Sequence, residues 1–122
     1  MKLFSMQENI FPQFATHNAH TVAAICDMAS QEQVPCEHYE FQRLHGMGET
    51  LYDVLRTNKP SVNVRIYAPI GQHEELLPYL VRRLLENGTN SAFVHLIADP
   101  HSATADLARH PVALLQSQTE LR

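Results

Sequence analysis

Two adjacent arginines, Arg82 and Arg83, are the residues of this 122-residue sequence best suited to chemistry. Tyr79 stands one helical turn before the pair and Glu86 one turn after it, so the four side chains share one arc of a helix. Paired guanidiniums beside a tyrosine suit a carboxylate, because Arg offers several donors in a fixed plane. Glu86 is placed to orient one arginine. A solvated helix face with an Arg–Glu pair is the alternative, and the pattern alone favours it.

The other side of the same helix is continuously apolar. Leucine and valine fill half of its circumference, at Leu76, Leu77, Leu80, Val81, Leu84 and Leu85. This pattern predicts an amphipathic helix from about His73 to Asn87. Gly88 predicts its end, because glycine commonly follows the last turn of a helix. One more apolar stretch follows at residues 92–97.

A second polar group, Thr16, His17 and Asn18, follows a short apolar run. Its hydroxyl, imidazole and amide groups suit a polar ligand such as a nucleotide, since parallel α/β folds bind ligands after their strands. A helix N-cap at Thr16 or Asn18 explains the same residues. The segment His45–Gly48 is similarly ambiguous between a phosphate loop and a tight turn.

The chain repeats the same pattern three times: a β-type run, a polar loop and a helical stretch. The runs are residues 10–15, 39–44 and 62–67, and the first two helices are predicted at about His20–Gln31 and Glu49–Asn58. Such alternation indicates an α/β fold with parallel strands, either a (β/α)₈ barrel or an open doubly wound sheet. Three units are too few for a barrel, which needs eight. We therefore expect missing strands, or pairing between copies of the chain.

Composition excludes several classes of function. A net charge of −4 provides no basic surface for nucleic acid. No apolar run reaches the roughly 20 residues of a membrane helix. Cys26 and Cys36 lack metal-binding spacing and are expected to be free thiols in a reducing, cytoplasmic compartment. The histidines, including His17 and His20, lack a recognised zinc motif, so we expect no metal site.

Three segments carry a family resemblance: FPQFATHNAHTVAAI, YEFQRLHGMGETLYDVL and VRIYAPIGQHEELLPYLVRRLLENGTNSAFVH. They resemble the proline dehydrogenase domain of the proline utilization A flavoproteins, over residues from about Phe11 to Asp99. The resemblance implies the last three βα units of a (β/α)₈ barrel at residues 10–97. Residues 1–9 stay unassigned. Residues 98–122 are expected to form a polar linker with a short helix between Ala103 and Arg109.

The resemblance also implies a substrate site for L-proline. Arg82 and Arg83 would grip its carboxylate, and Tyr79 would lie over its ring. Tyr67 and Leu44 would complete the pocket. The substrate lysine, the active-site aspartate and the main flavin-binding arginine of the family belong to earlier strands, so no catalytic residue is expected within this chain.

FAD is the cofactor that the resemblance implies. Thr16, His17 and Asn18 would contact its adenosine half, and Glu86 would support the arginine on the flavin side. The family oxidises L-proline to 1-pyrroline-5-carboxylate by hydride transfer to flavin N5, and a quinone reoxidises the flavin. Its full-length members are cytoplasmic and peripheral to the inner membrane.

Two hypotheses about the chain itself follow. In the first, it is part of a proline dehydrogenase and is active only with the missing half-barrel. In the second, it is an inactive remnant, or a self-assembling α/β module that binds a carboxylate through Arg82 and Arg83.

Overall fold

A computed structural model describes residues 2–6, 8–98, 112 and 116 of the chain. The chain divides into two units, Met1–Arg83 and Leu84–Arg122. The first unit contains all three strands and the first two α-helices. It also contains most of the residues to which the sequence assigns a function.

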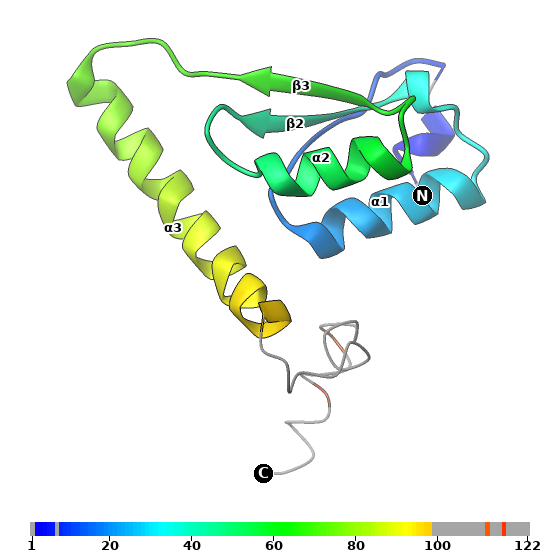
Figure 1. Cartoon of the computed structure of the whole chain (residues 1–122). Coiled ribbons are helices and arrows are strands. Elements are labelled where there is room, and N and C mark those ends of the chain that lie inside the picture. Colours follow the sequence, from blue (N-terminus) through cyan, green and yellow to red (C-terminus); the bar gives the residue numbers. More distant parts are fainter. Residues whose placement is uncertain (1, 7, 99–111, 113–115, 117–122) are drawn as a thin grey trace. The chain divides into compact units, whose positions relative to one another are not determined.

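Three short parallel strands form one sheet, in the order β1-β2-β3 (Figure 1). They are β1 (Gln13–Ala15), β2 (Glu40–Leu44) and β3 (Asn63–Tyr67). In register, Phe14 pairs with Phe41, and Phe41 with Val64. The predicted parallel α/β arrangement is confirmed. β1 begins only after Pro12, whose missing N–H cannot join the ladder, although its carbonyl still accepts from the Glu40 N–H at 3.0 Å.

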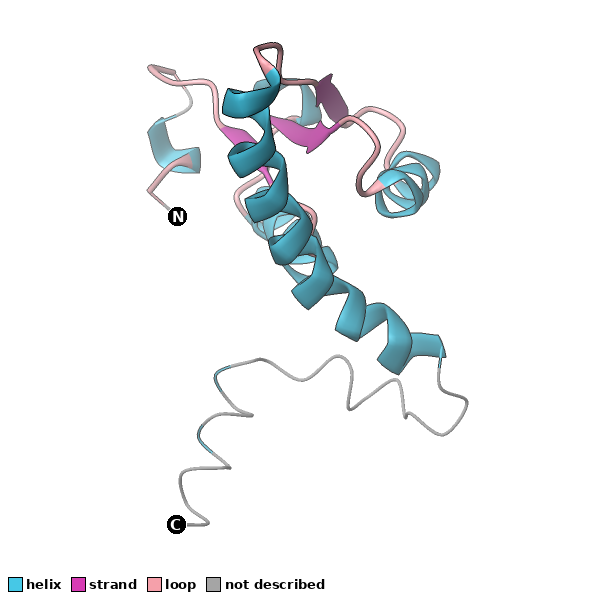
Figure 2. Ribbon diagram, turned by 90° about the vertical axis from the view of Figure 1, so that its left-hand side faces the viewer, coloured by secondary structure: helices cyan, strands magenta, loops and turns pink. Residues whose placement is uncertain are grey.

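Two helices cover one face of this sheet, as Figure 1 shows. They are α1 (Ala19–Gln31) and α2 (Glu49–Asn58), close to the predicted boundaries. Figure 2 shows how strands, in magenta, alternate with loops and helices along the chain. The core between sheet and helices is built from buried apolar side chains: Phe4, Val22, Ile25, Cys26, Ala29, Val34, Tyr39, Phe41, Tyr52, Leu55 and Val62.

The N-terminal segment also contributes to the core. Its short 3₁₀ helix, η1 (Phe4–Met6), buries Phe4. The Phe4 ring makes edge contacts with Phe14 and Tyr39, at centroid distances of 5.7 Å and 5.5 Å. A second 3₁₀ helix, η2 (Cys36–His38), precedes β2. Both cysteines are free thiols, as expected.

The last helix is longer than the sequence predicts. α3 (His73–Ala98) continues through Gly88, so the predicted end at this glycine is wrong. A glycine that ends a helix usually adopts a left-handed conformation, and Gly88 does not. Inside a helix a glycine costs only about 1 kcal/mol relative to alanine, which the surrounding turns can tolerate. The residues 92–97 therefore belong to α3.

The short helix predicted between Ala103 and Arg109 lies outside the described residues. Within the described part of the chain, no helix is long and apolar enough to span a membrane. The same residues hold no group of three or more His, Cys, Asp or Glu side chains that could bind a metal ion.

The sheet face away from α1 and α2 is polar and is organised by Glu40, a buried carboxylate. Arg65 donates to both of its oxygens, at 2.7 Å and 2.8 Å. Gln13 and Gln42 donate to Oε1 at 2.7 Å and 2.9 Å. Hydrogen bonding from Arg65, helped by both glutamines, lowers the Glu40 pKa to about 2 against the opposing effect of burial. Side chains from all three strands therefore meet at one carboxylate.

Glu40 should make the stability of the fold sensitive to acid. Its folded pKa is depressed, so ionised Glu40 stabilises the fold above its ordinary pKa of 4.5, and this stabilisation is lost as pH falls toward 2. Urea unfolding of Glu40→Gln and of the unmodified chain, compared from about pH 6 to about pH 3, should show a difference in unfolding free energy that shrinks with acid. Glu37→Gln is the control, because Glu37 is exposed. A difference that does not change with pH would contradict this role of Glu40.

Candidate functional site

The parallel strands bring three loops to one edge of the sheet. Thr16–Asn18 follows β1, His45–Gly48 follows β2, and residues 68–72 follow β3. Because all three strands point the same way, these loops gather at their carboxyl ends, where parallel α/β folds place their sites. The predicted site residues that precede Glu86 lie in these loops, at the ends of β2 and β3, or on α3.

The segment Thr16–Asn18 is held by hydrogen bonds within the protein. Asn18 caps α1, since its Oδ1 accepts from the Thr21 N–H at 3.0 Å. Thr16 Oγ1 accepts from the Asn18 N–H at 3.2 Å, and His17 Nε2 accepts from the Leu44 N–H at 3.1 Å. The N-cap explanation is therefore confirmed for Asn18. All three side chains of the segment are half-buried.

Tyr52, which the sequence pattern did not single out, also fixes this segment. Its hydroxyl donates to the Thr16 carbonyl at 2.6 Å. The ring lies in the core, and this burial raises the pKa of Tyr52 to about 12. The sequence does contain a signal for this role. Tyr52 lies one turn before Leu55, on the buried face of α2, and a buried tyrosine hydroxyl usually needs a hydrogen-bond partner.

The loop after β2 is a tight turn built on two glycines. Gly46 and Gly48 have φ values of +80° and +67°, which residues with a side chain rarely adopt. Arg43 stabilises the turn: its guanidinium donates to the Met47 carbonyl at 3.1 Å and forms an ion pair with Glu49 at 3.6 Å. The tight-turn explanation for this loop is confirmed.

Leu44 and Tyr67 lie side by side at the ends of β2 and β3, where they are register partners. Phe41 points into the core on the helix side of the sheet. Because side chains alternate along a strand, Leu44 points to the opposite face, and its partner Tyr67 does the same. Leu44 is almost fully buried, and Tyr67 is half-buried.

Tyr79 and Arg83 of α3 meet Tyr67 at this edge. The Arg83 guanidinium lies over the Tyr79 ring, 4.9 Å from its centroid. The pKa of Tyr67 is raised by burial and by hydrogen bonding with Tyr79, and Arg83 opposes this rise. One cation and two phenols therefore form a single contact group, which we call the Tyr67 cluster: Tyr67, Tyr79 and Arg83.

The other predicted site residues of α3 are exposed. Arg82 is exposed, and Arg83 is the member of the pair that lies over the Tyr79 ring. Glu86 is exposed and belongs to the other unit, Leu84–Arg122.

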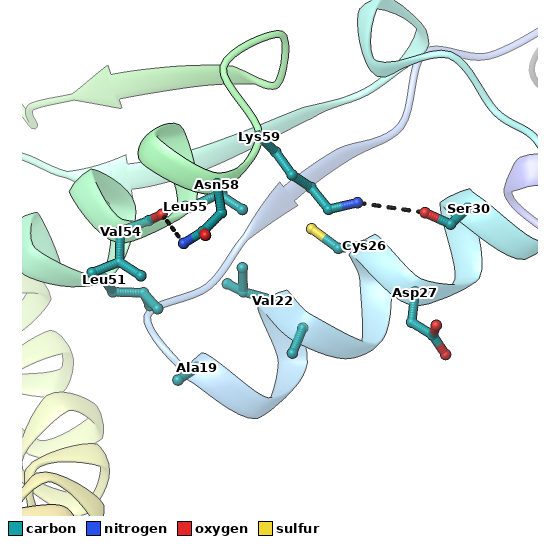
Figure 3. A pocket seen from close by; sticks show the side chains of 11 residues that line it. Ala19, Val22, Cys26, Asp27, Ser30, Leu51, Val54, Leu55, Asn58 and Lys59 are labelled. Atoms are coloured by element: carbon teal, nitrogen blue, oxygen red, sulfur yellow. Dashed lines mark hydrogen bonds between the residues drawn. The ribbon is translucent and has the colours of Figure 1, made fainter.

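A cavity of about 410 Å³ lies on the opposite face of the sheet, between α1 and α2. Figure 3 shows Lys59 reaching across to α1, where its Nζ donates to Ser30 Oγ at 3.4 Å. The Cys26 thiol points toward the lysine side chain; burial raises its pKa, and Lys59 opposes that rise. The predicted site residues do not line this cavity.

The proline dehydrogenase family model matches residues 1–96 of the chain. This chain belongs to the proline dehydrogenase family. The expected family resemblance is thereby confirmed for most of the sequence.

The relatives of this family member are much longer proteins. It is 51% identical to the bifunctional protein PutA of Escherichia coli, over 94% of this chain and 9% of that protein. It is 55% identical to PutA of Rhizobium meliloti, over 87% of this chain and 9% of that protein. A crystal structure of a proline utilization A mutant from Bradyrhizobium japonicum matches with a TM-score of 0.73 and 50% identity, over 93% of this chain and 11% of that one. The chain thus spans about a tenth of the length of these relatives.

Replacing Tyr52 with phenylalanine tests how strongly Thr16–Asn18 is held. The change removes the hydroxyl that donates to the Thr16 carbonyl and leaves a partly buried acceptor without this donor. We expect Tyr52→Phe to lower the free energy of unfolding in urea by about 1–2 kcal/mol.

Thr57→Ala is the matched control for Tyr52→Phe. It also removes a hydroxyl that donates to a backbone carbonyl, that of Asp53 at 2.9 Å, but at an exposed position. Its effect should stay within about 0.5 kcal/mol. If both variants lose the same free energy of unfolding, the Tyr52 hydroxyl does not hold Thr16–Asn18 more strongly than an exposed hydroxyl holds its own helix.

Proposed function

We propose that this chain supplies the carboxyl-terminal part of the active site of a FAD-dependent proline dehydrogenase, which oxidises L-proline to 1-pyrroline-5-carboxylate. The observation that carries this proposal is the Tyr67 cluster, with Leu44 beside it. It combines a guanidinium with aromatic and aliphatic side chains at the carboxyl ends of parallel strands. A small cyclic amino acid presents the matching chemistry, a carboxylate on a compact apolar ring.

Each residue then has a distinct binding role. Arg83, with Arg82 beside it, binds the carboxylate of proline by charge-assisted hydrogen bonds. Tyr79 lies over the proline ring, and its contact with Arg83 supports this assignment. Tyr67 and Leu44 form the wall at the strand ends. These residues orient the substrate, and we assign the proton and hydride chemistry to none of them.

The loop after β1 is the proposed cofactor contact. Thr16, His17 and Asn18 fit the adenosine half of FAD, because their backbone is fixed by internal hydrogen bonds and their side chains stay partly accessible. We assign Glu86 to the arginine on the flavin side. Bound FAD would accept the hydride at its N5 atom and pass electrons to a quinone.

We infer further that residues 10–97 are the last three βα units of a (β/α)₈ barrel, with residues 1–9 before them and residues 98–122 as a linker. A barrel closes with eight parallel strands, and the described sheet has three. Large apolar side chains are exposed in the unit Met1–Arg83, as expected where further strands and helices would pack, including Phe11, Val54, Ile66 and Leu77.

Methionine at Arg82 or Arg83 tests the carboxylate contact in a complete proline dehydrogenase that carries this segment. Each change removes a charged hydrogen-bond donor worth about 1.5–3 kcal/mol, so the KM for proline should rise roughly 10- to 150-fold. Steady-state kinetics with proline measure this change.

Arg56→Met is the control, because Arg56 is an exposed arginine on α2, away from the strand ends. It should leave the KM for proline unchanged. A KM that stays unchanged in both site variants would remove this arginine pair from the substrate site.

A further inference from the structure

We propose that His17 is a positioning residue: its Nε2 accepts from the Leu44 N–H in place of the Thr16 carbonyl and so holds Leu44 at the end of β2. For the role of Leu44 in binding substrate, this inference rests on the proposed function. The hydrogen bond itself does not depend on that function.

Alternate carbonyls of β1 face β2. The Pro12 carbonyl accepts from the Glu40 N–H at 3.0 Å, and the spacing of two residues in a parallel ladder assigns Phe14 to Gln42 and Thr16 to Leu44. The series breaks at its third member. The Thr16 carbonyl accepts from the Tyr52 hydroxyl, at 2.6 Å. The Leu44 N–H donates instead to His17 Nε2, at 3.1 Å.

The imidazole thus extends the pairing of β1 and β2 by one hydrogen bond beyond the end of β1. Leu44 is only 1% exposed, so without His17 its N–H would be buried with no acceptor in the ladder. To accept this bond, Nε2 must be unprotonated, which fixes the tautomer of the neutral ring. The next peptide is anchored to β3, since the His45 N–H donates to the Tyr67 carbonyl at 2.8 Å.

Gly48 keeps the imidazole in its place. A Cβ atom built on Gly48 would lie 2.9 Å from His17 Cδ2, closer than real Cβ atoms approach. A side chain at this position must therefore displace the ring or the loop. The absence of a side chain at Gly48 and the hydrogen bond from Leu44 together set the position of His17.

The consequence is a connection between two parts of the proposed site. Thr16–Asn18 is the proposed cofactor segment, and Leu44 is part of the proposed substrate wall. His17 links them through one hydrogen bond, so a shift of either segment changes the position of the other. This role differs from a direct contact between His17 and the adenosine of FAD.

Scalar coupling across the hydrogen bond, between the ¹⁵N nuclei of the Leu44 amide and His17 Nε2, tests the inference directly in the full ¹⁵N-labelled chain. We expect a measurable coupling and an unprotonated Nε2. His17→Ala should accelerate hydrogen exchange of the Leu44 amide by roughly tenfold or more. A folded chain with no coupling and a protonated Nε2 would overturn the inference.

The two glycines of the loop provide a matched pair of variants. Both have positive φ, so alanine is strained at either position, but a Cβ on Gly46 meets no atom within 4 Å. Gly48→Ala should therefore weaken the coupling and the protection of the Leu44 amide, whereas Gly46→Ala should keep both. Equal effects of the two variants would contradict the proposed place of His17.

Kinetics in a complete enzyme that carries this segment separate positioning from a need for the imidazole itself. His17→Ala should raise the KM for proline more than it lowers kcat. His17→Gln, whose amide oxygen can accept from the Leu44 N–H, should recover most of the loss. A glutamine variant as defective as the alanine variant would overturn the positioning role. If the coupling is found in this chain but the complete enzyme that carries the segment does not oxidise proline, the hydrogen bond stands and only the proposed function is rejected.

Discussion

The parallel pairing of β2 with both neighbouring strands is the constraint on which the rest of the structure depends. It brings the carboxyl ends of three strands to one edge, so that Thr16–Asn18, Leu44 and Tyr67 become neighbours although they are far apart in sequence. A shift of β2 by one residue would turn Leu44 toward the helices, away from Tyr67, and would expose Phe41. The core and the proposed substrate wall therefore depend on the same register.

The two faces of the sheet stabilise this register by different interactions. On the helix side, Phe41 and Tyr52 pack in a core of aromatic and aliphatic side chains. On the other side, Glu40 accepts hydrogen bonds from side chains of all three strands, including Arg65. A charged network costs desolvation energy, but it requires a specific alignment of the strands that apolar packing does not require. Toward the carboxyl edge this face becomes apolar at Leu44, beside the Tyr67 cluster.

The sequence predicted the elements well, because hydrophobic periodicity and strand–helix alternation are local signals. The site residues proposed after the strands stay predictions, although the structure places Leu44 and Tyr67 side by side at the strand ends. The sequence prediction failed at Gly88, where helix termination depends on a left-handed conformation that the residue does not adopt. The pairing of Tyr52 with Thr16 and of Glu40 with Arg65 could not be predicted, because these partners lie 36 and 25 residues away and meet only in the folded chain.

We propose that this chain completes a proline dehydrogenase site and does not form one alone. The most direct measurement is the visible spectrum after gel filtration with FAD, recorded before and after addition of proline. It compares the chain alone with the chain mixed with a separately expressed upstream part of a relative such as the Escherichia coli protein. We predict that flavin co-elutes and is bleached by proline only in the mixture. The account would be contradicted if the chain alone retains flavin that proline bleaches. It would also be contradicted if the mixture forms a complex but retains no flavin that proline bleaches.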